Sequence, residues 1–314
     1  MIRIVHVSDF HLEKEQPSLK QKEILDALIL DLEQYVNEEV IIIFSGDLID
    51  KSGLQFSDKE SRFLTFKKVF IDRINKTYPS TLGRIFIVPG NHDFDRSMVD
   101  EFTSIPFRDS LVSKPNIVDS YVQKTKKEGN NINGLLDYKI FEKALYSKRQ
   151  WSQFDSSFLL NSGNSTIGIS CFNSSWLCYE DENIEKLFLS EAQIESSINF
   201  ISEANIKIAV MHHPFEFYHK EDLDKFKSLL YNNYHMVFVG HTHKLESKQI
   251  DDLDGNLFLS VGKSISGTKT RNTDFVNGYS VIDYFVDDKI SVSYKKYISN
   301  TTSFVINTDI GNDK

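Results

Sequence analysis

The stretch Phe44-Ser45-Gly46-Asp47-Leu48-Ile49-Asp50 directly follows four consecutive apolar residues, Val40 to Ile43. A short apolar run of this kind is typical of a strand that is buried on both faces. Gly46 permits a tight turn where this strand ends. Asp47 would then lie at the carboxyl end of a central strand, where open α/β sheets bind their ligands. The stretch alone is also compatible with ordinary turn chemistry, so its meaning depends on the rest of the chain.

The remaining sequence predicts strands and helices in alternation. Apolar residues recur at helical spacing in residues 17–37 and 57–78, and short apolar runs mark strands at 2–7, 40–44 and 85–88. Alternation of this kind predicts a parallel sheet and an α/β fold. Further strands are predicted at 166–172, 206–211, 236–239, 257–261, 279–285 and 290–297, and further helices at 190–202 and 221–231.

Five of the predicted strands end in polar clusters made of residue types that bind metal ions. The clusters are Asp9/His11, Asp47/Asp50, Asn91/His92/Asp93, His212/His213 and His241/His243. Residues two apart on an extended chain point the same way, so each Asp-x-His or His-x-His pair can bind one ion together. Imidazole mixed with carboxylate suits Mn, Fe, Zn or Ni better than Mg or Ca. Two ions about 3.5–4 Å apart, joined by a shared carboxylate, can hold a hydroxide between them. That hydroxide can attack phosphorus in line with the leaving group.

This ordered series of motifs resembles that of the calcineurin-like metallophosphoesterase superfamily. The motifs are Asp9-x-His11, Gly46-Asp47-x-x-Asp50, Gly90-Asn91-His92-Asp93, His212-His213-Pro214 and Gly240-His241-Thr242-His243. The resemblance covers residues 2–261 apart from an inserted segment. It implies an α/β, four-layer sandwich in which two mixed β-sheets pack between helices.

The resemblance also implies a role for each site residue. The residues that would hold one of two divalent ions are Asp9, His11 and His243, and those that would hold the other are Asn91, His212 and His241. Asp47 would bridge the two ions, and we expect Mn²⁺, with Fe, Zn or Ni as alternatives. His92 would be the general acid for the leaving group, and Asp93 would orient His92 by a hydrogen bond. His212 is preferred over His213 as the ligand.

Departures from the superfamily pattern narrow the choice of substrate. Its protein Ser/Thr phosphatases usually carry Arg after the second Asp and Glu after the Asn-His pair, where this chain has Lys51 and Asp93. The pattern is more similar to cyclic-nucleotide phosphodiesterase-like proteins and double-strand-break repair nucleases. Residues 88–96 also resemble bacterial phosphoesterases, some of which are effector domains of larger proteins or complexes.

The resemblance leaves three functions open. The first is a two-metal phosphodiesterase that acts on nucleotides or nucleic acid, and the sequence does not decide between a polymer and a small nucleotide. The second is a phosphomonoesterase that acts on a small metabolite or a protein. The third is an inactive scaffold, although such scaffolds have degraded ligands and this chain retains all of the motif residues.

Candidate substrate contacts lie outside the metal motifs. Arg96 could contact a substrate phosphate or form a surface salt bridge. Asn173 could donate a hydrogen bond to phosphate, and Trp176 or Tyr179 could stack on a base, although core packing is the commoner fate of an aromatic ring. Cys171 and Cys178 are expected to be buried thiols.

We predict a metallophosphoesterase domain at residues 1–299 and a tail or linker at 300–314. Residues 108–150 are a Lys-rich insertion with nine basic and five acidic residues, partly helical near 140–146. The insertion could be a solvated loop or a cap that meets an anionic substrate.

Composition limits the class of protein. The net charge of −9 argues against a surface coated for duplex DNA, although a local basic groove remains compatible with it. Two cysteines are too few for a disulfide framework, which favours a reducing, cytoplasmic location. No secretory signal fits the first residues, and no apolar run is long enough to cross a membrane.

Overall fold

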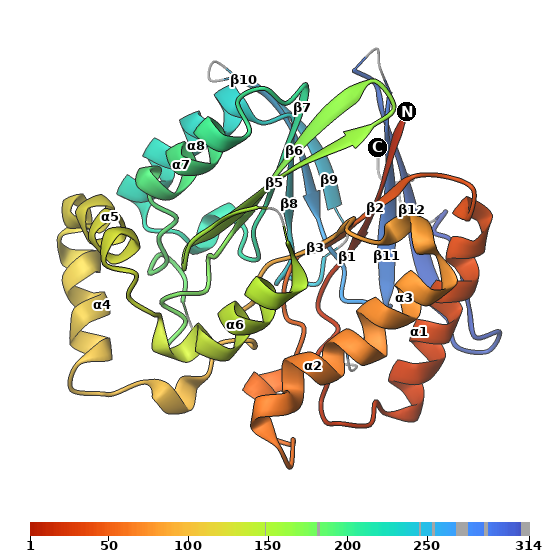
Figure 1. Ribbon diagram of the computed structural model, residues 1–314, viewed down its shortest axis with the longest axis horizontal. Helices are drawn as coiled ribbons and strands as arrows, with labels where there is room; N and C mark the ends of the chain where they lie inside the picture. The colour runs from red at the N-terminus through yellow and green to blue at the C-terminus, as the bar shows by residue number, and fades with distance from the viewer. Residues whose placement is uncertain are drawn as a thin grey trace.

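The computed structural model describes residues 1–147, 149–180, 183–244, 246–252, 255–267, 276–285 and 288–308. Within these residues the strands form two mixed sheets, one of six strands and one of seven, with helices on their outer faces (Figure 1). This confirms the predicted four-layer α/β sandwich. None of the described helices is long and apolar enough to cross a membrane.

The first sheet has the strand order β13-β12-β11-β1-β2-β3. Its strands are β1 Ile2–Val7, β2 Val40–Phe44, β3 Ile85–Ile87, β11 Gly278–Tyr284, β12 Ile290–Ile298 and β13 Ser303–Ile306. β1, β2 and β3 run parallel, whereas β11 to β13 form an antiparallel extension beside β1. All five residues of β2 are buried, as expected for a central strand with helices and a second sheet on its two faces.

The second sheet has the strand order β4-β5-β6-β7-β8-β10-β9. Its strands are β4 Gln150–Trp151, β5 Asp155–Ser162, β6 Ser165–Phe172, β7 Ile206–Val210, β8 Met236–Val239, β9 Glu246–Asp252 and β10 Gly255–Val261. β6, β7, β8 and β10 are parallel, and the remaining strands pair antiparallel at the two edges. The carboxyl ends of β1 and β2 in the first sheet and of β8 in the second meet in one region, because a Cβ atom on Gly240 would lie 2.2 Å from the hydroxyl of Ser8 and 2.8 Å from the carbonyl oxygen of Ser45.

The helices are α1 Leu19–Leu32, α2 Arg62–Phe66, α3 Asp72–Thr77, α4 Ser104–Ser113, α5 Val118–Glu128, α6 Leu136–Leu145, α7 Glu191–Phe200 and α8 Lys220–Asn233. Some of the helices pack on the two sheets, and others pack on those helices: α5 contacts α7, and α6 contacts α2. α1 contacts the first sheet at β13, and α7 and α8 contact the second at β5 and β10. The helix predicted at 57–78 is in three parts, because a π-helical segment, Lys67–Ile71, separates α2 from α3.

Side chains of the two sheets meet between the layers and form the centre of the core. The rings of Phe86 on β3 and Phe158 on β5 lie 5.0 Å apart. His6 on β1 packs its ring edge against Phe238 on β8, at a centroid distance of 4.9 Å. His6 Nδ1 also lies 2.9 Å from the hydroxyl of Ser260 on β10, and His6 Nε2 lies 2.9 Å from the hydroxyl of Ser45. Apolar and polar contacts thus hold the two sheets together.

Two sequence-based expectations need correction at this level. The insertion at 108–150 is not a solvated loop: its described residues form most of α4, together with α5 and α6, and bury side chains such as Leu111, Val122 and Phe141. The first sheet also continues beyond residue 299, because β13 pairs with β12. Lys148 and residues 309–314, which were included in the predicted insertion and tail, lie outside the described residues.

Candidate metal centre and active site

The loops that follow the parallel strands adopt an unusual backbone conformation. The residues with left-handed φ angles include Asp9 (55°), His11 (51°), Asp47 (57°), His241 (69°) and His243 (55°). Residues other than glycine seldom adopt positive φ, and Asp, Asn and His do so more often than most. Sparsely populated conformations of this kind concentrate at functional sites, where surrounding structure maintains them. The concentration of such residues in these loops marks the region as a candidate site.

Two glycines allow these loops to approach one another closely. A Cβ atom on Gly90 would lie 2.0 Å from Oδ1 of Asp47, and one on Gly46 would lie 2.3 Å from Nδ1 of His212. Gly46 also has a φ of 102°, which side-chain-bearing residues rarely adopt. A larger residue at either position would displace Asp47 or His212.

The first cluster consists of Asp9, His11 and His243. His243 Nε2 lies 3.1 Å from Oδ1 of Asp9, and His11 Nε2 lies 3.8 Å from the same oxygen. Asp9 and His11 follow β1 in the first sheet, whereas His243 comes from the loop after β8 in the second sheet. The cluster therefore forms only when both sheets are in place.

The second cluster consists of Asn91, His212 and His241. Oδ1 of Asn91 lies 3.1 Å from Nε2 of His212 and 2.9 Å from Nδ1 of His241. His212 is fully buried, and its Nδ1 lies 2.7 Å from the carbonyl oxygen of Ser45, so Nδ1 donates and Nε2 is turned toward the cluster. Burial and the neighbouring His212 lower the pKa of His241 to about 4, which keeps this imidazole neutral, the form that binds metal ions.

Asp47 lies between the two clusters. Its Oδ2 atom is 3.3 Å from Nε2 of His212 and 3.8 Å from Nε2 of His11. Burial opposes ionisation of this carboxyl, but His212 and His92 nevertheless hold the pKa of Asp47 well below its usual range. A buried carboxylate that reaches both clusters has the position that a bridging ligand requires.

The donor set fits divalent transition-metal ions. Three carboxylate, amide and imidazole groups converge in each cluster, and Asp47 is within reach of both. Oδ2 of Asp9 is buried and has no hydrogen-bond partner among the described residues, which is costly for a carboxylate unless it binds a cation. Imidazole nitrogen combined with carboxylate oxygen favours transition metals over Mg²⁺ and Ca²⁺. The residues present would thus hold two ions, although the geometry does not select Mn²⁺ from the other metals.

His92 lies beside the first cluster and faces a different carboxylate from the one predicted. The His92 and His11 rings are 4.6 Å apart between centroids. His92 Nδ1 lies 3.0 Å from Oδ1 of Asp50. Burial lowers the pKa of His92, but Asp47 and the hydrogen bond with Asp50 outweigh it, so that the pKa is raised. Two groups therefore face Nδ1 of His92: the carboxylate of Asp50, for which the sequence analysis assigned no role, and the backbone N–H of Lys51 at 3.2 Å.

Asp93 organises the backbone around the site. Its two carboxyl oxygens accept hydrogen bonds from the N–H groups of Leu48, Ile49 and Gly90, at 3.1, 3.0 and 2.8 Å. Burial and the nearby Asp47 charge raise the pKa of Asp93 to about 7 despite these donors. Asp93 thus joins the loop after β2 to the loop after β3, instead of forming the predicted hydrogen bond with His92.

His213 is directed away from the carboxylates. It is fully buried, with Nδ1 2.8 Å from the hydroxyl of Ser174 and Nε2 3.7 Å from Sγ of Cys178. Cys171 and Cys178 are both buried free thiols. His212, in contrast, contacts Asn91 and Asp47. His213 nevertheless lies near enough to His212 and His241 for the three imidazoles to share an ion, so the choice of His212 over His213 as the ligand stays a prediction.

The three candidate substrate contacts differ in their surroundings. Arg96 lines a recess of about 210 Å³ that also includes His92. Asn173 is buried, and its side chain donates to the carbonyl of Gln153 and accepts from the N–H of Ser175. Trp176 is 2% exposed and donates its indole N–H to the carbonyl of Phe188. Arg96 therefore lies beside His92, whereas Asn173 and Trp176 serve the packing of the loop after β6, and substrate contact by any of the three stays a prediction.

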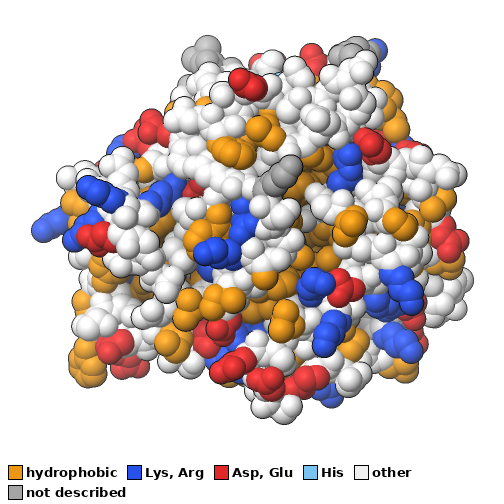
Figure 2. All heavy atoms as spheres, in the orientation of Figure 1, with side chains coloured by type: hydrophobic (Ala, Val, Ile, Leu, Met, Phe, Trp, Pro, Cys, Tyr) orange, Lys and Arg blue, Asp and Glu red, His pale blue; other side chains and the backbone are white. Residues whose placement is uncertain are grey.

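Several basic residues of the helical insertion are engaged in ion pairs. Lys126 Nζ lies 2.6 Å from the buried carboxylate of Asp155, and Arg108 lies 3.1 Å from Glu180. Lys139, which is buried, pairs with Glu142. On the face shown in Figure 2, Lys and Arg side chains are interspersed with Asp and Glu side chains. The positive charge counted in the sequence is thus distributed among internal contacts and does not form one continuous basic surface on this face.

Comparison with known proteins identifies the family of this centre. The sequence profile described as "Calcineurin-like phosphoesterase" matches residues 2–245, which include all of the residues of both clusters. The chain belongs to the calcineurin-like phosphoesterases. The resemblance predicted from the motifs is confirmed, and this family is one of metal-dependent hydrolases.

Solved structures extend this comparison to the fold of the calcineurin-like phosphoesterase chain. The sulfate thiohydrolase SoxB from Thermus thermophilus has 10% identity and a TM-score of 0.53, with 98% of this chain and 58% of that chain covered. A 5′-nucleotidase precursor, also from Thermus thermophilus, has 11% identity and a TM-score of 0.47, with 97% and 54% covered. Zinc-complexed Vps29 from Entamoeba histolytica has 14% identity and a TM-score of 0.40, with 98% and 97% covered.

This chain therefore spans little more than half the length of the first two structures. A search of curated proteins found no match. At these identities the structural likeness concerns the fold alone.

Proposed function

We propose that this calcineurin-like phosphoesterase hydrolyses phosphodiester bonds of nucleotides or nucleic acid, with His92 as the general acid. The observation that carries the proposal is the Asp50–His92 pair next to the two clusters. Because Nδ1 of His92 faces Asp50 at 3.0 Å, Nε2 is the ring nitrogen that would donate a proton to the leaving group. A nucleotide phosphodiester releases an alkoxide, which is a poor leaving group, so proton donation has a large effect on its cleavage.

The remaining residues of the centre hold the cofactors and position the reacting phosphate. The first cluster would hold one divalent ion and the second cluster would hold the other. Asp47 would be a ligand of both ions. When bound, two such ions neutralise charge on the phosphate and supply a nucleophile at neutral pH. Asp93 keeps the Asp47 and His92 loops in register through its backbone hydrogen bonds, and Arg96 lies where it could contact the phosphate or its leaving group.

Two observations favour a diester over a protein phosphomonoester. Lys51 and Asp93 occupy positions where protein phosphatases of the superfamily usually have Arg and Glu. The recess of about 210 Å³ beside His92 also provides space for a leaving group of appreciable size. The ion pairing of Lys126, Lys139 and Arg108 supports a short substrate more than a long polymer, because these side chains are already neutralised.

The location and partners of the protein are part of the same proposal. Buried free thiols at Cys171 and Cys178 are typical of a reducing compartment, so we propose a cytoplasmic location. An association with a larger effector assembly is a further possibility suggested by the resemblance of residues 88–96. Salt dependence of substrate binding distinguishes a polymer from a small nucleotide, since polymer binding weakens steeply with added salt.

The proposal is tested with Mn²⁺-loaded protein, a bis-aryl phosphodiester and the corresponding aryl phosphomonoester. Preferential cleavage of the diester is the expected result. Asp47→Asn is the matched blank: it should lose most of the activity and reduce bound metal at both sites, as measured by mass spectrometry. Preferential monoester cleavage would replace the proposal with a phosphomonoesterase. A metal-loaded protein without activity on either ester would indicate a scaffold.

A further inference from the structure

A second cavity lies between the helical insertion and the loop that follows β6. Its volume is about 320 Å³, at the lower end of the range typical of small-molecule sites. Residues of α4, α5, the segment before α6 and the segment after His92 line it, together with Trp176 and Tyr179. None of these residues belongs to either metal cluster.

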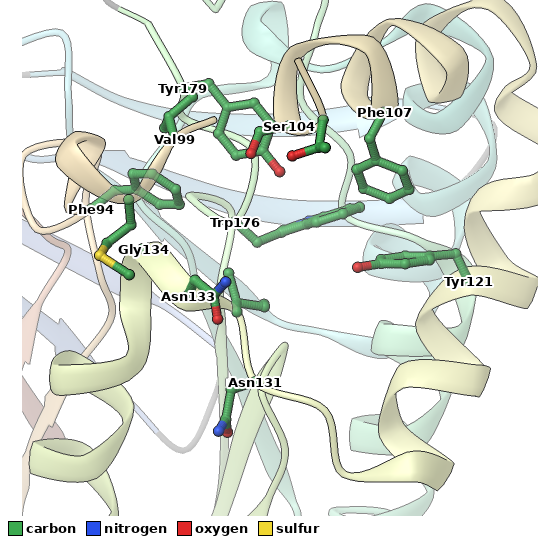
Figure 3. A pocket seen from close by; sticks show the side chains of 13 residues that line it. Phe94, Val99, Ser104, Phe107, Tyr121, Asn131, Asn133, Gly134, Trp176 and Tyr179 are labelled. Carbon is green, nitrogen blue, oxygen red and sulfur yellow. The ribbon is translucent and has the colours of Figure 1, made fainter. Parts of the chain in front are cut away.

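The walls of this cavity are mainly aromatic. Figure 3 shows the rings of Phe107, Tyr121, Trp176 and Tyr179 grouped around one hollow. Trp176 is almost fully buried and lies nearly parallel to Tyr121, at an interplanar angle of 15°. Phe107, Tyr121 and Tyr179 are only partly buried. The cavity thus combines a rigid indole wall with rings that a planar ligand could contact, and stacking is favourable for any nucleobase.

Polar groups stand at the edge of the aromatic walls. The Ser104 hydroxyl accepts a hydrogen bond from the N–H of Asp100 at 3.1 Å, which leaves its O–H group to donate. Oδ1 of Asn131 accepts from Gln153 at 3.0 Å, which leaves its NH₂ group to donate to a ligand. In Figure 3 the side chains of Ser104 and Asn133 lie on opposite sides of the Trp176 ring. A planar ring with polar edges matches this arrangement better than a purely apolar group does.

Phe94 connects the cavity to the active site. It lines both this cavity and the recess beside His92, and it follows His92 by two residues, a span of at most about 7 Å between Cα atoms. The insertion is fixed to the same segment, because the N–H of Asp95 donates to the carbonyl of Gly134 at 2.7 Å. A group in the cavity would therefore lie close to a phosphate that reacts next to His92.

We propose that this aromatic cavity binds the nucleobase of the substrate and thereby selects nucleotide esters over other phosphate esters. That the bound nucleotide is a substrate rests on the proposed phosphodiesterase function. That the cavity binds a nucleobase does not. The existence of a base-binding site can be tested separately, by binding.

The test is calorimetric titration of chelator-treated protein with AMP and with ribose 5-phosphate. The two ligands carry the same sugar phosphate and differ in the base, and hydrolysis is prevented because metal is absent. AMP should bind at least about tenfold more tightly, since base stacking supplies the difference. Ser104→Phe places a ring in the cavity and should reduce the affinity for AMP to that for ribose 5-phosphate.

Ser110→Phe is the control. Ser110 is an exposed residue of the same helix, α4, and does not line the cavity. The same substitution at this position should therefore leave the preference for AMP over ribose 5-phosphate intact. Asn133→Phe, at the opposite edge, serves as a second filling variant if Ser104→Phe fails to fold. Equal affinities for AMP and ribose 5-phosphate would overturn the proposal. An AMP preference that persists in both folded filling variants would also overturn it, because the base would then bind elsewhere.

The outcomes separate this proposal from the proposed function. If the protein cleaves aryl diesters but does not prefer AMP, the phosphodiesterase function stands and the base-binding cavity is rejected. If AMP is preferred and cavity filling abolishes the preference, but no ester is cleaved, nucleotide binding stands and the hydrolytic function is rejected.

Discussion

Asp50 and His92 lie 42 residues apart in sequence and are in direct contact in the site. The motif spacing predicts that His92 is a functional residue, but it does not reveal which of several nearby carboxylates faces the ring. The sequence-adjacent Asp93 was the predicted partner, yet three backbone N–H groups already occupy its oxygens. Motif spacing was therefore enough to single out His92 as a candidate functional residue. Its hydrogen-bond partner was not predictable, because the partner depends on how the loops after β2 and β3 face each other.

Replacement of His92 tests its role as the general acid. His92→Ala should reduce kcat/KM for a diester with a poor leaving group by about 10²–10⁴-fold, because the departing alkoxide then receives no proton. A diester with a good leaving group should be affected much less. The measurement compares phenyl and 4-nitrophenyl diesters under identical metal loading. Equal losses with both would exclude proton donation by His92.

Replacement of Asp50 tests how His92 is kept protonated. Asp50 contributes to the raised pKa of His92, and a general acid is active only below its pKa. Asp50→Asn should lower this pKa and move the alkaline limb of the kcat/KM profile to lower pH. Metal content is measured alongside, because Asp50 Oδ1 also lies 3.9 Å from His11 Nδ1. An unchanged alkaline limb at normal metal content would show that Asp50 does not set the protonation of His92.

At the scale of elements, the helical insertion is locked to the active-site loop by a close contact at Gly134. A Cβ atom there would lie 2.2 Å from Cζ of Phe94, whose side chain is itself buried. Phe94 follows His92 by two residues, so the packing of the insertion and the position of the general acid are connected. The insertion is thus packed against the loop that carries His92 and is not a separate surface appendage.

Gly134→Ala should reduce the free energy of unfolding by about 1–3 kcal/mol, since overpacking of a buried contact has this cost. Urea denaturation provides the measurement. Phe94→Leu in the same chain makes room for the added methyl group, so the double variant should lose less stability than the two single variants combined. Strictly additive losses would show that the two residues do not share the contact.

The strands and helices that the sequence analysis did not predict share one property: polar or charged residues interrupt their apolar pattern. β5 is rich in Ser and exposes residues at its far end, and β9 is almost entirely polar, so neither shows an apolar run. In the insertion, the buried residues Val118, Val122 and Thr125 do recur at helical spacing, but the many charged residues of α5 obscured the pattern. The central strands were predictable because their apolar residues are mostly buried, whereas edge strands depend on their neighbours; the ligand roles of the residues that follow the central strands stay a prediction.

At the scale of the whole molecule, His6 joins the two sheets through the hydroxyls of Ser260 and Ser45. Burial, only partly offset by Asp9, lowers the pKa of His6 to about 3. In the unfolded chain His6 would bind a proton near its ordinary pKa of about 6.5. Between these values the unfolded state binds more protons than the folded state, so acid destabilises the fold.

The free energy of unfolding should therefore fall as the pH decreases from about 6.5 toward 3, by up to about 1.4 kcal/mol per pH unit from His6 alone. His6→Asn removes the titrating group and should flatten this part of the stability curve. Urea midpoints of the two proteins at several pH values give the difference. Parallel curves for wild type and variant would show that His6 does not account for acid sensitivity.

The order of the ligands along the chain has a consequence for biosynthesis. Asp9 and His11 are made first, but their cluster lacks its third member until His243 has been synthesised, and Asn91 likewise precedes His212 and His241. A nascent chain that ends before the second sheet is complete would offer the cell only open, partial clusters. If these clusters hold the proposed ions, metal loading would be delayed until translation has passed residue 243, and a prematurely terminated product would lack a complete pair of clusters.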